Sequence, residues 1–228
     1  VTYFPEPTAT ISGTTEMCLG GSAVITISLT GAMPYDFIYT DGTTPVTVTN
    51  HPSMVYTFTV TPLVPTTYMV TSMNDNNGCI GTPLGSAVVT INPSLSLTLS
   101  GTNVACYGDS NGAIDLSVAG GTAPFSYAWS GPAGYTAGVQ DISGLQAGYY
   151  SVVVTDSKGC TASGNITITQ PVQLTLSSTG NIALLCNGAT TGAGSFTAAG
   201  GTAPYTFNIV ADNTGATLTT AATSASFT

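Results

Sequence analysis

The sequence is almost without positive charge. Its 228 residues include no arginine and a single lysine, Lys158, and the formal net charge is −9. Nucleic-acid binding is excluded, because nothing in the chain can neutralise phosphates. Attraction to an anionic membrane surface is excluded for the same reason. Charged residues of both signs make up only 5% of the chain, against about a quarter in a typical soluble domain, so solubility must come from Thr, Ser, Asn and Gly.

A helical apolar period and a long hydrophobic run are also missing. No run approaches the length of a membrane span, so no membrane insertion is expected. Thr, Val, Ile and Tyr are frequent and suit a pleated surface, and Gly and Pro recur every few residues, as short strands joined by turns require. The sequence therefore predicts an all-β fold. No signal peptide is visible at Val1, and we expect the chain to be an excerpt of a longer polypeptide.

The residues that most enzymes need are scarce. The only histidine, His51, stands between Asn50 and Pro52, a turn-like setting in which we expect a solvated loop residue. A serine or cysteine hydrolase needs a base beside its nucleophile, and there is no phosphate-binding loop, dinucleotide fingerprint or HExxH motif. We expect no enzyme activity and no cofactor.

An internal repeat is the strongest signal that is present. Asn103-Val-Ala-Cys-Tyr-Gly108 precedes Gly120-Gly-Thr-Ala-Pro124, and Leu184-Leu-Cys-Asn-Gly188 precedes Gly200-Gly-Thr-Ala-Pro204 with the same spacing from Cys to Pro. Cys18-Leu-Gly20 followed by Gly31-Ala-Met-Pro34 is a looser copy. Self-similarity at a fixed period indicates a repeat architecture.

The second halves of the repeats match as well. Each has a strand, a tight turn and a cysteine: Thr67–Cys79 overlies Tyr149–Cys160, and Asn92-Pro93 and Gln170-Pro171 then form natural junctions. The predicted domains are residues 1–93, 94–171 and 172–228, the last of which stops before its second cysteine. Repeats that each fold as one unit and contact only their neighbours are typical of such arrays.

The five cysteines follow this plan. The simplest pairing is Cys18 with Cys79 and Cys106 with Cys160, inside each module, while Cys186 would bond to a residue beyond the excerpt; spacing alone does not fix connectivity. Each bond would stabilise its module by roughly 4 kcal/mol in the chain-entropy model. Disulfides imply an oxidising, extracytoplasmic setting. The alternatives are reduced structural cysteines or a metal site, although the chain has no CxxC pair.

Aromatic residues alternate after each repeated proline. Period two places side chains on one face of a strand, so we expect the inner face of a β-sandwich strand. The alternative is a carbohydrate-stacking platform. The residues concerned are Tyr35, Phe37 and Tyr39, then Phe125, Tyr127 and Trp129, then Tyr205, Phe207 and Ile209.

The spacing of Leu145, Gly148 and Tyr150 resembles a tyrosine corner, in which the hydroxyl bonds back to an upstream backbone group. This supports tandem immunoglobulin-like Greek-key β-sandwiches, each with one intramodule disulfide. A faint calcium-loop pattern, Asp109, Asn111 and Asp115, lacks the terminal bidentate Glu. We interpret it as a turn entering a strand, with calcium as the alternative.

The second repeat resembles the SprB repeat of very large surface adhesins in gliding and related Bacteroidetes. Residues 95–171 resemble it well, 172–228 resemble a truncated copy, and 1–93 are similar to PKD-like or Ig-like modules. The resemblance implies export to the outer cell surface, by the type IX route, and a role in adhesion or gliding motility. The segments that carry it are Cys106–Gly108, Asn111–Val118, Gly120–Pro124, Tyr127–Ser130, Leu145–Gly148, Val152–Asp156, Gly159–Cys160 and Thr167–Pro171.

These observations favour a structural spacer, a stalk whose partners are the neighbouring modules of the same chain. One alternative is a carbohydrate-binding module for surface polysaccharide, with Tyr107 and Tyr135 as the binding residues. Another is a subunit of an extracellular filament, since few charges protect the strand edges from pairing with other proteins.

Overall fold

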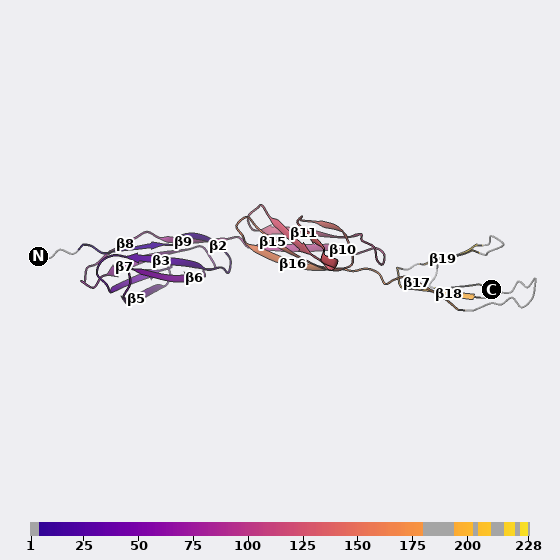
Figure 1. Ribbon diagram of the computed structural model, residues 1–228, viewed down its shortest axis with the longest axis horizontal. Coiled ribbons are helices and arrows are strands. Elements are labelled where there is room, and N and C mark those ends of the chain that lie inside the picture. The colour runs from indigo at the N-terminus through magenta and orange to yellow at the C-terminus, as the bar shows by residue number, and fades with distance from the viewer. Residues whose placement is uncertain (1–4, 180–193, 203–204, 211–216, 222–223, 228) are drawn as a thin grey trace, which may run out of the picture. The chain divides into compact units, whose positions relative to one another are not determined.

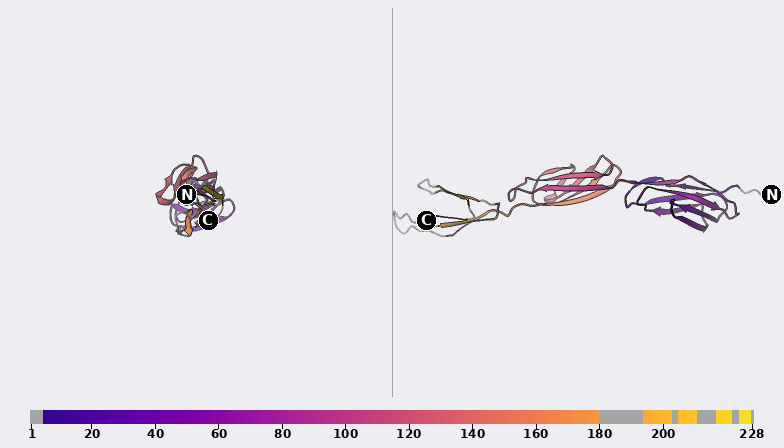
Figure 2. Two further views of the ribbon diagram at one scale, coloured as in Figure 1. Left: turned by 90° about the vertical axis from the view of Figure 1, so that its right-hand side faces the viewer. Right: turned by 180° about the vertical axis from the view of Figure 1, so that it is seen from behind.

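The computed structural model describes residues 5–179, 194–202, 205–210, 217–221 and 224–227. The chain forms two compact units. Unit 1 consists of Val1–Ser96, Val118–Ser126 and Val154–Ala162, and unit 2 of Leu97–Ser117, Tyr127–Val153 and Ser163–Thr228. Each sheet is nevertheless built from strands of a single sequence repeat (Figures 1 and 2). No helix in the described part of the chain is long and apolar enough to cross a membrane.

The first repeat is a sandwich of two sheets. One has the strand order β6-β3-β1-β8 and the other β2-β9-β7-β4-β5. Most neighbours are antiparallel, but β1 pairs with β8, and β2 with β9, in parallel. The strands are β1 (Thr8–Ser12), β2 (Thr15–Cys18), β3 (Ala23–Leu29), β4 (Tyr35–Thr40), β5 (Pro45–His51), β6 (Val55–Val60), β7 (Thr66–Asn74), β8 (Thr82–Leu84) and β9 (Ala87–Asn92).

The core of this sandwich comes from the alternation that the sequence shows. In β3 every second side chain is buried, and in β4 Tyr35, Phe37 and Tyr39 are 0%, 2% and 9% exposed. Phe37 and Tyr39 contact rings of β6, with Tyr39 stacked on Phe58 at 4.3 Å between centroids. For the first repeat the prediction of a core-facing aromatic strand is confirmed, and a surface stacking platform at Tyr35, Phe37 and Tyr39 is excluded. In the second repeat Trp129 is buried, whereas Phe125 and Tyr127 are half-buried. The side chains of Phe207 and Ile209 lie outside the described residues.

The second repeat is a sandwich of the same kind. Ile114, Leu116 and Leu145 are buried from the sheet β10-β11-β14, and Trp129 and Tyr150 from the sheet β13-β12-β15-β16. The elements are β10 (Leu95–Thr102), β11 (Gly112–Gly120), β12 (Ser126–Ser130), a 3-10 helix (Pro132–Gly134), β13 (Thr136–Ala137), β14 (Ile142–Leu145), β15 (Gly148–Thr155) and β16 (Thr161–Ile168).

In the third repeat the structure describes only part of the chain. The strand orders are β17-β18-β21 and β19-β20, and the pairs β17–β18, β18–β21 and β19–β20 are antiparallel. The strands are β17 (Thr175–Thr179), β18 (Gly194–Ala199), β19 (Thr206–Val210), β20 (Thr217–Ala221) and β21 (Ser224–Phe227).

Candidate functional site

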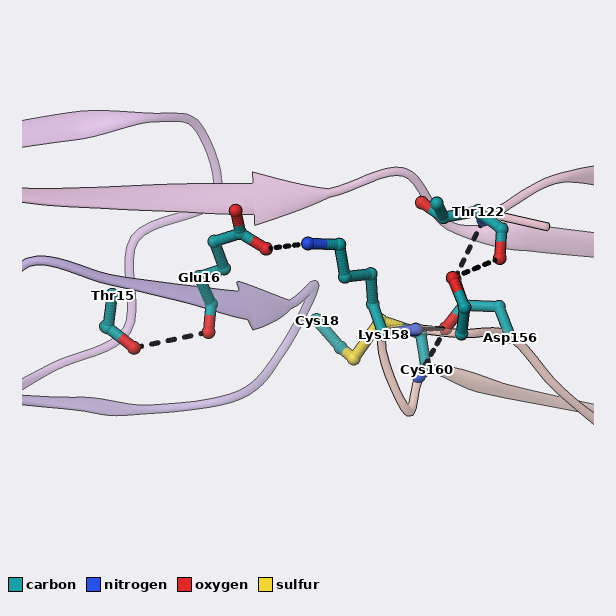
Figure 3. Close-up of a disulfide and its surroundings, with 8 residues drawn as sticks. Thr15, Glu16, Cys18, Thr122, Asp156, Lys158 and Cys160 are labelled. Carbon is teal, nitrogen blue, oxygen red and sulfur yellow. Dashed lines mark hydrogen bonds and ion pairs between the residues drawn. A yellow bond between two sulfur atoms is a disulfide. The ribbon is translucent and has the colours of Figure 1, made fainter. Parts of the chain in front are cut away.

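One disulfide joins two cysteines that belong to different sequence repeats. Cys18, at the end of β2, is bonded to Cys160, which follows β15 (Figure 3). The S–S bond is 2.04 Å, the Cα atoms are 5.5 Å apart, and the sequence separation is 142. Both cysteines lie in unit 1, because the Cys160 turn clusters with the first sandwich.

The expected pairing inside each module is therefore wrong. Cys79 and Cys106 are free, and Cys186 lies outside the described residues. The strand registers explain why. Cys18 lies opposite Asn92 in the β2–β9 pair. Strand β7 runs antiparallel to β9 from the Thr66–Val89 pair, and Cys79 follows only after β7 has ended at Asn74.

The distance across the sandwich prevents an intramodule bond. At about 3.3 Å per residue, the length of β7 separates the two ends of the sheet by roughly 25 Å. A disulfide requires Cα atoms within about 7 Å. The cysteines of one repeat therefore lie at opposite ends of its sandwich. The spacing of cysteines in the sequence does not show this, because it does not give the strand registers.

A buried aspartate organises the turn that carries Cys160. Asp156 Oδ1 accepts hydrogen bonds from the backbone N–H groups of Lys158 (2.9 Å) and Cys160 (2.8 Å), and Oδ2 accepts one from Thr122 (2.9 Å). Burial opposes the charged form, but the Cys160, Thr122 and Lys158 N–H groups outweigh it and lower the pKa of Asp156. The carboxylate thus ties the cysteine turn to the Gly120–Pro124 loop.

Asp75 makes the same arrangement in the first repeat. It accepts hydrogen bonds from the N–H groups of Asn77 (3.0 Å), Cys79 (3.0 Å) and Ala32 (3.1 Å). The Ala32 bond is the largest cause of its lowered pKa. We name the Asp-x-x-Gly-Cys segments 75–79 and 156–160 the Asp turns. The sequence predicts them as hairpin turns, but it does not show that each carboxylate also reaches a distant loop.

The diglycine of each GGTAP motif packs against the segment that leads into its own repeat. A Cβ at Gly120 would lie 2.1 Å from the carbonyl oxygen of Ser94, and one at Gly200 would lie 2.0 Å from that of Gln173. Both glycines also have a positive φ, 72° and 76°, which residues with a Cβ rarely adopt. These close approaches explain why the diglycine recurs.

The single lysine of the chain contributes an ion pair beside the disulfide. Lys158 Nζ is 2.5 Å from Glu16 Oε2 (Figure 3), and the side chains are 42% and 53% exposed. Surface ion pairs of this kind contribute about 0–1 kcal/mol. The covalent bond, and not the charge pair, therefore dominates this contact.

The tyrosine corner is confirmed. Tyr150 is 1% exposed, and its hydroxyl donates a 3.0 Å hydrogen bond to the carbonyl of Gln146. Burial, the largest cause, raises its pKa. The sequence missed that Tyr35 donates the same kind of bond to Gly31, also at 3.0 Å.

The two tyrosines proposed for carbohydrate binding have different surroundings. Tyr107 is 52% exposed and lines a cavity of about 440 Å³ together with Cys106, Val172 and Leu174. Tyr135 is half-buried, and its ring packs edge-on against Tyr150 at 5.5 Å. It does not line that cavity.

The calcium-loop residues are used locally. Asn111 Oδ1 accepts a hydrogen bond from the N–H of Ala105 (3.0 Å), and the N–H of Asp109 closes a turn on the carbonyl of Cys106 (3.2 Å). Asp115 points outward from β11. Within the described ranges no three His, Cys, Asp or Glu side chains gather as a metal site would require.

His51 differs from its expected solvated position. It ends β5, and its Nε2 is 3.1 Å from the carbonyl oxygen of Val55. Its ring lies edge-on to Phe37 and Tyr56, at 6.0 Å and 5.3 Å between centroids. The strand pairing of Tyr35 with His51 holds it over the aromatic core.

Comparison with known proteins agrees with this architecture. Residues 98–134 match the SprB repeat. No curated protein matches the chain. Among solved structures, the eight N-terminal Ig domains of Down Syndrome Cell Adhesion Molecule share 13% identity at a TM-score of 0.52, over 93% of this chain and 30% of that one. This chain therefore spans less than a third of that structure's length.

Two further solved structures are less similar to this chain. A C-terminal fragment of intimin, solved with its receptor domain, has 14% identity and a TM-score of 0.42 over 77% of this chain and 67% of that one. A bacterial ice-binding adhesin has 15% identity and a TM-score of 0.39, with 96% and 85% covered. Only the first of the three structures is close enough to show a shared fold. The chain is thus an all-β protein of tandem Ig-like sandwiches, and its residues 98–134 match the SprB repeat.

Proposed function

We propose that this chain is a structural stalk segment of a large secreted cell-surface adhesin. The SprB repeat and the Ig-like sandwiches support an adhesive or structural repeat module of a surface protein. The disulfide supports an oxidising, extracytoplasmic setting. Type IX export and a part in gliding motility belong to the same proposal and rest on the SprB resemblance. No catalytic role enters it.

The Cys18–Cys160 bond is the single observation that carries the stalk role. When the chain is pulled from its two ends, tension passes through the sulfur bridge and not through the residues between the two cysteines. Those residues contain most of the first sandwich and most of the second. One covalent bond therefore protects most of two repeats from unfolding under force. This suits a stalk segment, which must keep its length when it is pulled.

Single-molecule force extension of the 228-residue chain, oxidised and reduced, tests this role. The bond hides a stretch with a sequence separation of 142, which corresponds to roughly 470–510 Å of contour at about 3.3–3.6 Å per residue. We expect the oxidised chain to lack this length and the reduced chain, or Cys18→Ser, to release it. Cys79→Ser is the matched control and should behave as the parent.

Equal contour lengths in oxidised and reduced chains would contradict the mechanical role. So would two shorter hidden lengths, abolished separately by Cys79→Ser and Cys106→Ser, since these would indicate a bridge inside each repeat. The surface location has its own test: on intact cells of the source organism, antibodies to this segment should bind without permeabilisation. Labelling only after lysis would refute it.

A further inference from the structure

The loop around the free thiol of Cys106 has the same backbone arrangement as the loop around the bonded Cys18. The carbonyl of Cys18 accepts a hydrogen bond from the N–H of Gly21 (3.0 Å), and that of Cys106 accepts one from the N–H of Asp109 (3.2 Å). Two residues after each cysteine is a glycine with positive φ, 83° at Gly20 and 81° at Gly108. Cys106 is exposed. Its loop therefore already has the form that Cys18 takes when bonded.

The surroundings of the two cysteines correspond as well. Cys18 and Leu19 line a cavity of about 230 Å³ with the linker Pro93-Ser94-Leu95, the Asp-turn residues Gly159 and Cys160, and Thr161. Cys106 and Tyr107 line one of about 440 Å³ with the matching linker, Pro171–Leu174, and with Gly201-Thr202. The larger cavity has the same cysteine loop and linker, but its lining contains no Asp turn.

Exposed apolar side chains line the larger cavity, and their exposure favours the binding of another segment there. Val172 and Leu174 are 74% and 57% exposed, and Tyr107 is 52% exposed. In the alignment of the repeats, Tyr107 corresponds to Leu19 and Gly201 to Gly121. Gly121 lies next to the Asp turn that holds Cys160, since a Cβ there would be 3.3 Å from Asp156 Oδ2. An Asp turn entering here would bring its own cysteine to Cys106, as segment 156–160 brings Cys160 to Cys18.

We propose that Cys106 forms a disulfide with the Asp-turn cysteine of the repeat that follows it in the polypeptide. By the same rule, Cys79 is the Asp-turn cysteine for the first cysteine of a preceding repeat. Cys18–Cys160 is then one link in a series that joins each repeat to the next. This inference rests on the proposed role as a repeat segment and specifies how its repeats are coupled.

The oxidation needs a disulfide-bearing oxidant, such as an extracytoplasmic thiol–disulfide oxidoreductase or oxidised glutathione. The Cys106 thiolate attacks one sulfur of the oxidant and forms a mixed disulfide, with release of the other sulfur as a thiolate. The Asp-turn thiolate then displaces the remaining half. The two cysteines lose two electrons and two protons in total, and the oxidant leaves as two thiols.

A chain extended by one Asp turn tests the proposal. Position for position, Cys186 matches Cys106 and Pro204 matches Pro124, so Thr228 matches Gly148. The 228-residue chain is followed by a copy of residues 149–171, which includes the Asp turn, and is oxidised with glutathione. Non-reducing digestion and mass spectrometry then map the bonds. We expect Cys18–Cys160 and a bond from Cys106 to the appended cysteine, with Cys79 and Cys186 alkylated.

The control replaces the appended cysteine by serine, and Cys106 should then be alkylated as in the unextended chain. A map with Cys18–Cys160 intact but the appended cysteine free, or bonded to Cys186, overturns the series and leaves the stalk role standing. A map without Cys18–Cys160 overturns both. In the unextended native chain, iodoacetamide should modify Cys106 while Cys18 and Cys160 stay protected, and protection of Cys106 there also counts against the proposal.

Discussion

Aspartates that each accept several hydrogen bonds from other residues fix the loops of this molecule. Asp156 and Asp75 each accept three backbone N–H bonds. In the β4–β5 hairpin Asp41 accepts bonds from the N–H of Thr44 and from both the N–H and the hydroxyl of Thr43. With one lysine in the chain, backbone N–H groups take the place of cationic partners for these carboxylates.

These carboxylates make stability depend on pH in one direction. The pKa of Asp41 is lowered to about 2, first by the Thr44 N–H, and those of Asp75 and Asp156 are also lowered. A carboxylate whose pKa is lower in the folded state contributes its full stabilisation above the unfolded-state pKa of about 3.9. This stabilisation is lost as the pH falls through the folded-state pKa. We therefore expect the thermal midpoint to be level from pH 7 to 5 and to fall between pH 4 and 2, measured by circular dichroism.

The Asp156→Asn variant isolates one of these carboxylates. Its amide keeps one acceptor oxygen, so at least one of the three N–H groups loses its partner. The variant should melt below the parent at pH 7 and show a smaller drop on acidification. Asp115→Asn, on the exposed face of β11, is the matched control with little effect expected. A parent whose midpoint is unchanged down to pH 2 would contradict this role.

At the scale of elements, the tyrosine corner anchors the entry to β15. Tyr150→Phe removes only the hydroxyl that bonds to Gln146 and should destabilise by about 0.5–1.5 kcal/mol, the usual net value of a hydrogen bond. Tyr149→Phe, next to it and 58% exposed, should change little. Urea unfolding followed by Trp129 fluorescence measures both. A Tyr150→Phe variant as stable as the Tyr149→Phe variant would refute the corner.

Alanine substitutions at Gly120 and Gly144 separate the cost of a strained backbone from the cost of a close contact. Gly120 and Gly144 have nearly equal φ, 72° and 71°, but a Cβ at Gly144 would meet nothing within 4 Å, whereas one at Gly120 would meet Ser94 O at 2.1 Å. Alanine at Gly144 should cost about 1–2 kcal/mol from the left-handed backbone alone. Alanine at Gly120 should cost clearly more in the same urea experiment. Equal losses would mean that the Ser94 contact is unimportant.

Much of this element-scale structure follows from the sequence. Alternation places Tyr35, Phe37 and Trp129 inward, because one face of each strand packs into the core. Contacts between segments distant in sequence were not predictable. Nothing at Asp156 indicates that Thr122 is its partner, and nothing at Gly120 indicates the carbonyl of Ser94, because both contacts depend on how loops from different strands meet.

At the scale of the whole molecule, the same limit produced the wrong disulfide pairing. The repeat shows two cysteines per module, and the simplest assumption joins them. The registers of β2, β7 and β9 instead place Cys18 and Cys79 at opposite ends of one sandwich. Of the candidate binding residues, Tyr107 is exposed beside Cys106, whereas Tyr135 packs against Tyr150.

The Cys18–Cys160 bond should raise the free energy of unfolding. In the chain-entropy model a bond across a separation of 142 restricts the unfolded chain by about 5 kcal/mol. Cys160→Ser should therefore lower the unfolding midpoint in urea, and Cys79→Ser, which removes a free thiol, should not. Equal effects of the two substitutions would contradict the asymmetry.

Peptide mapping of the unreduced 228-residue chain distinguishes a disulfide between repeats from disulfides inside each repeat. Free thiols are alkylated, the chain is digested without reduction, and linked peptides are identified by mass spectrometry. The expected result is one linked pair containing Cys18 and Cys160, with Cys79 and Cys106 alkylated. Linked pairs of Cys18 with Cys79 and of Cys106 with Cys160 would contradict the covalent coupling of the first repeat to the second.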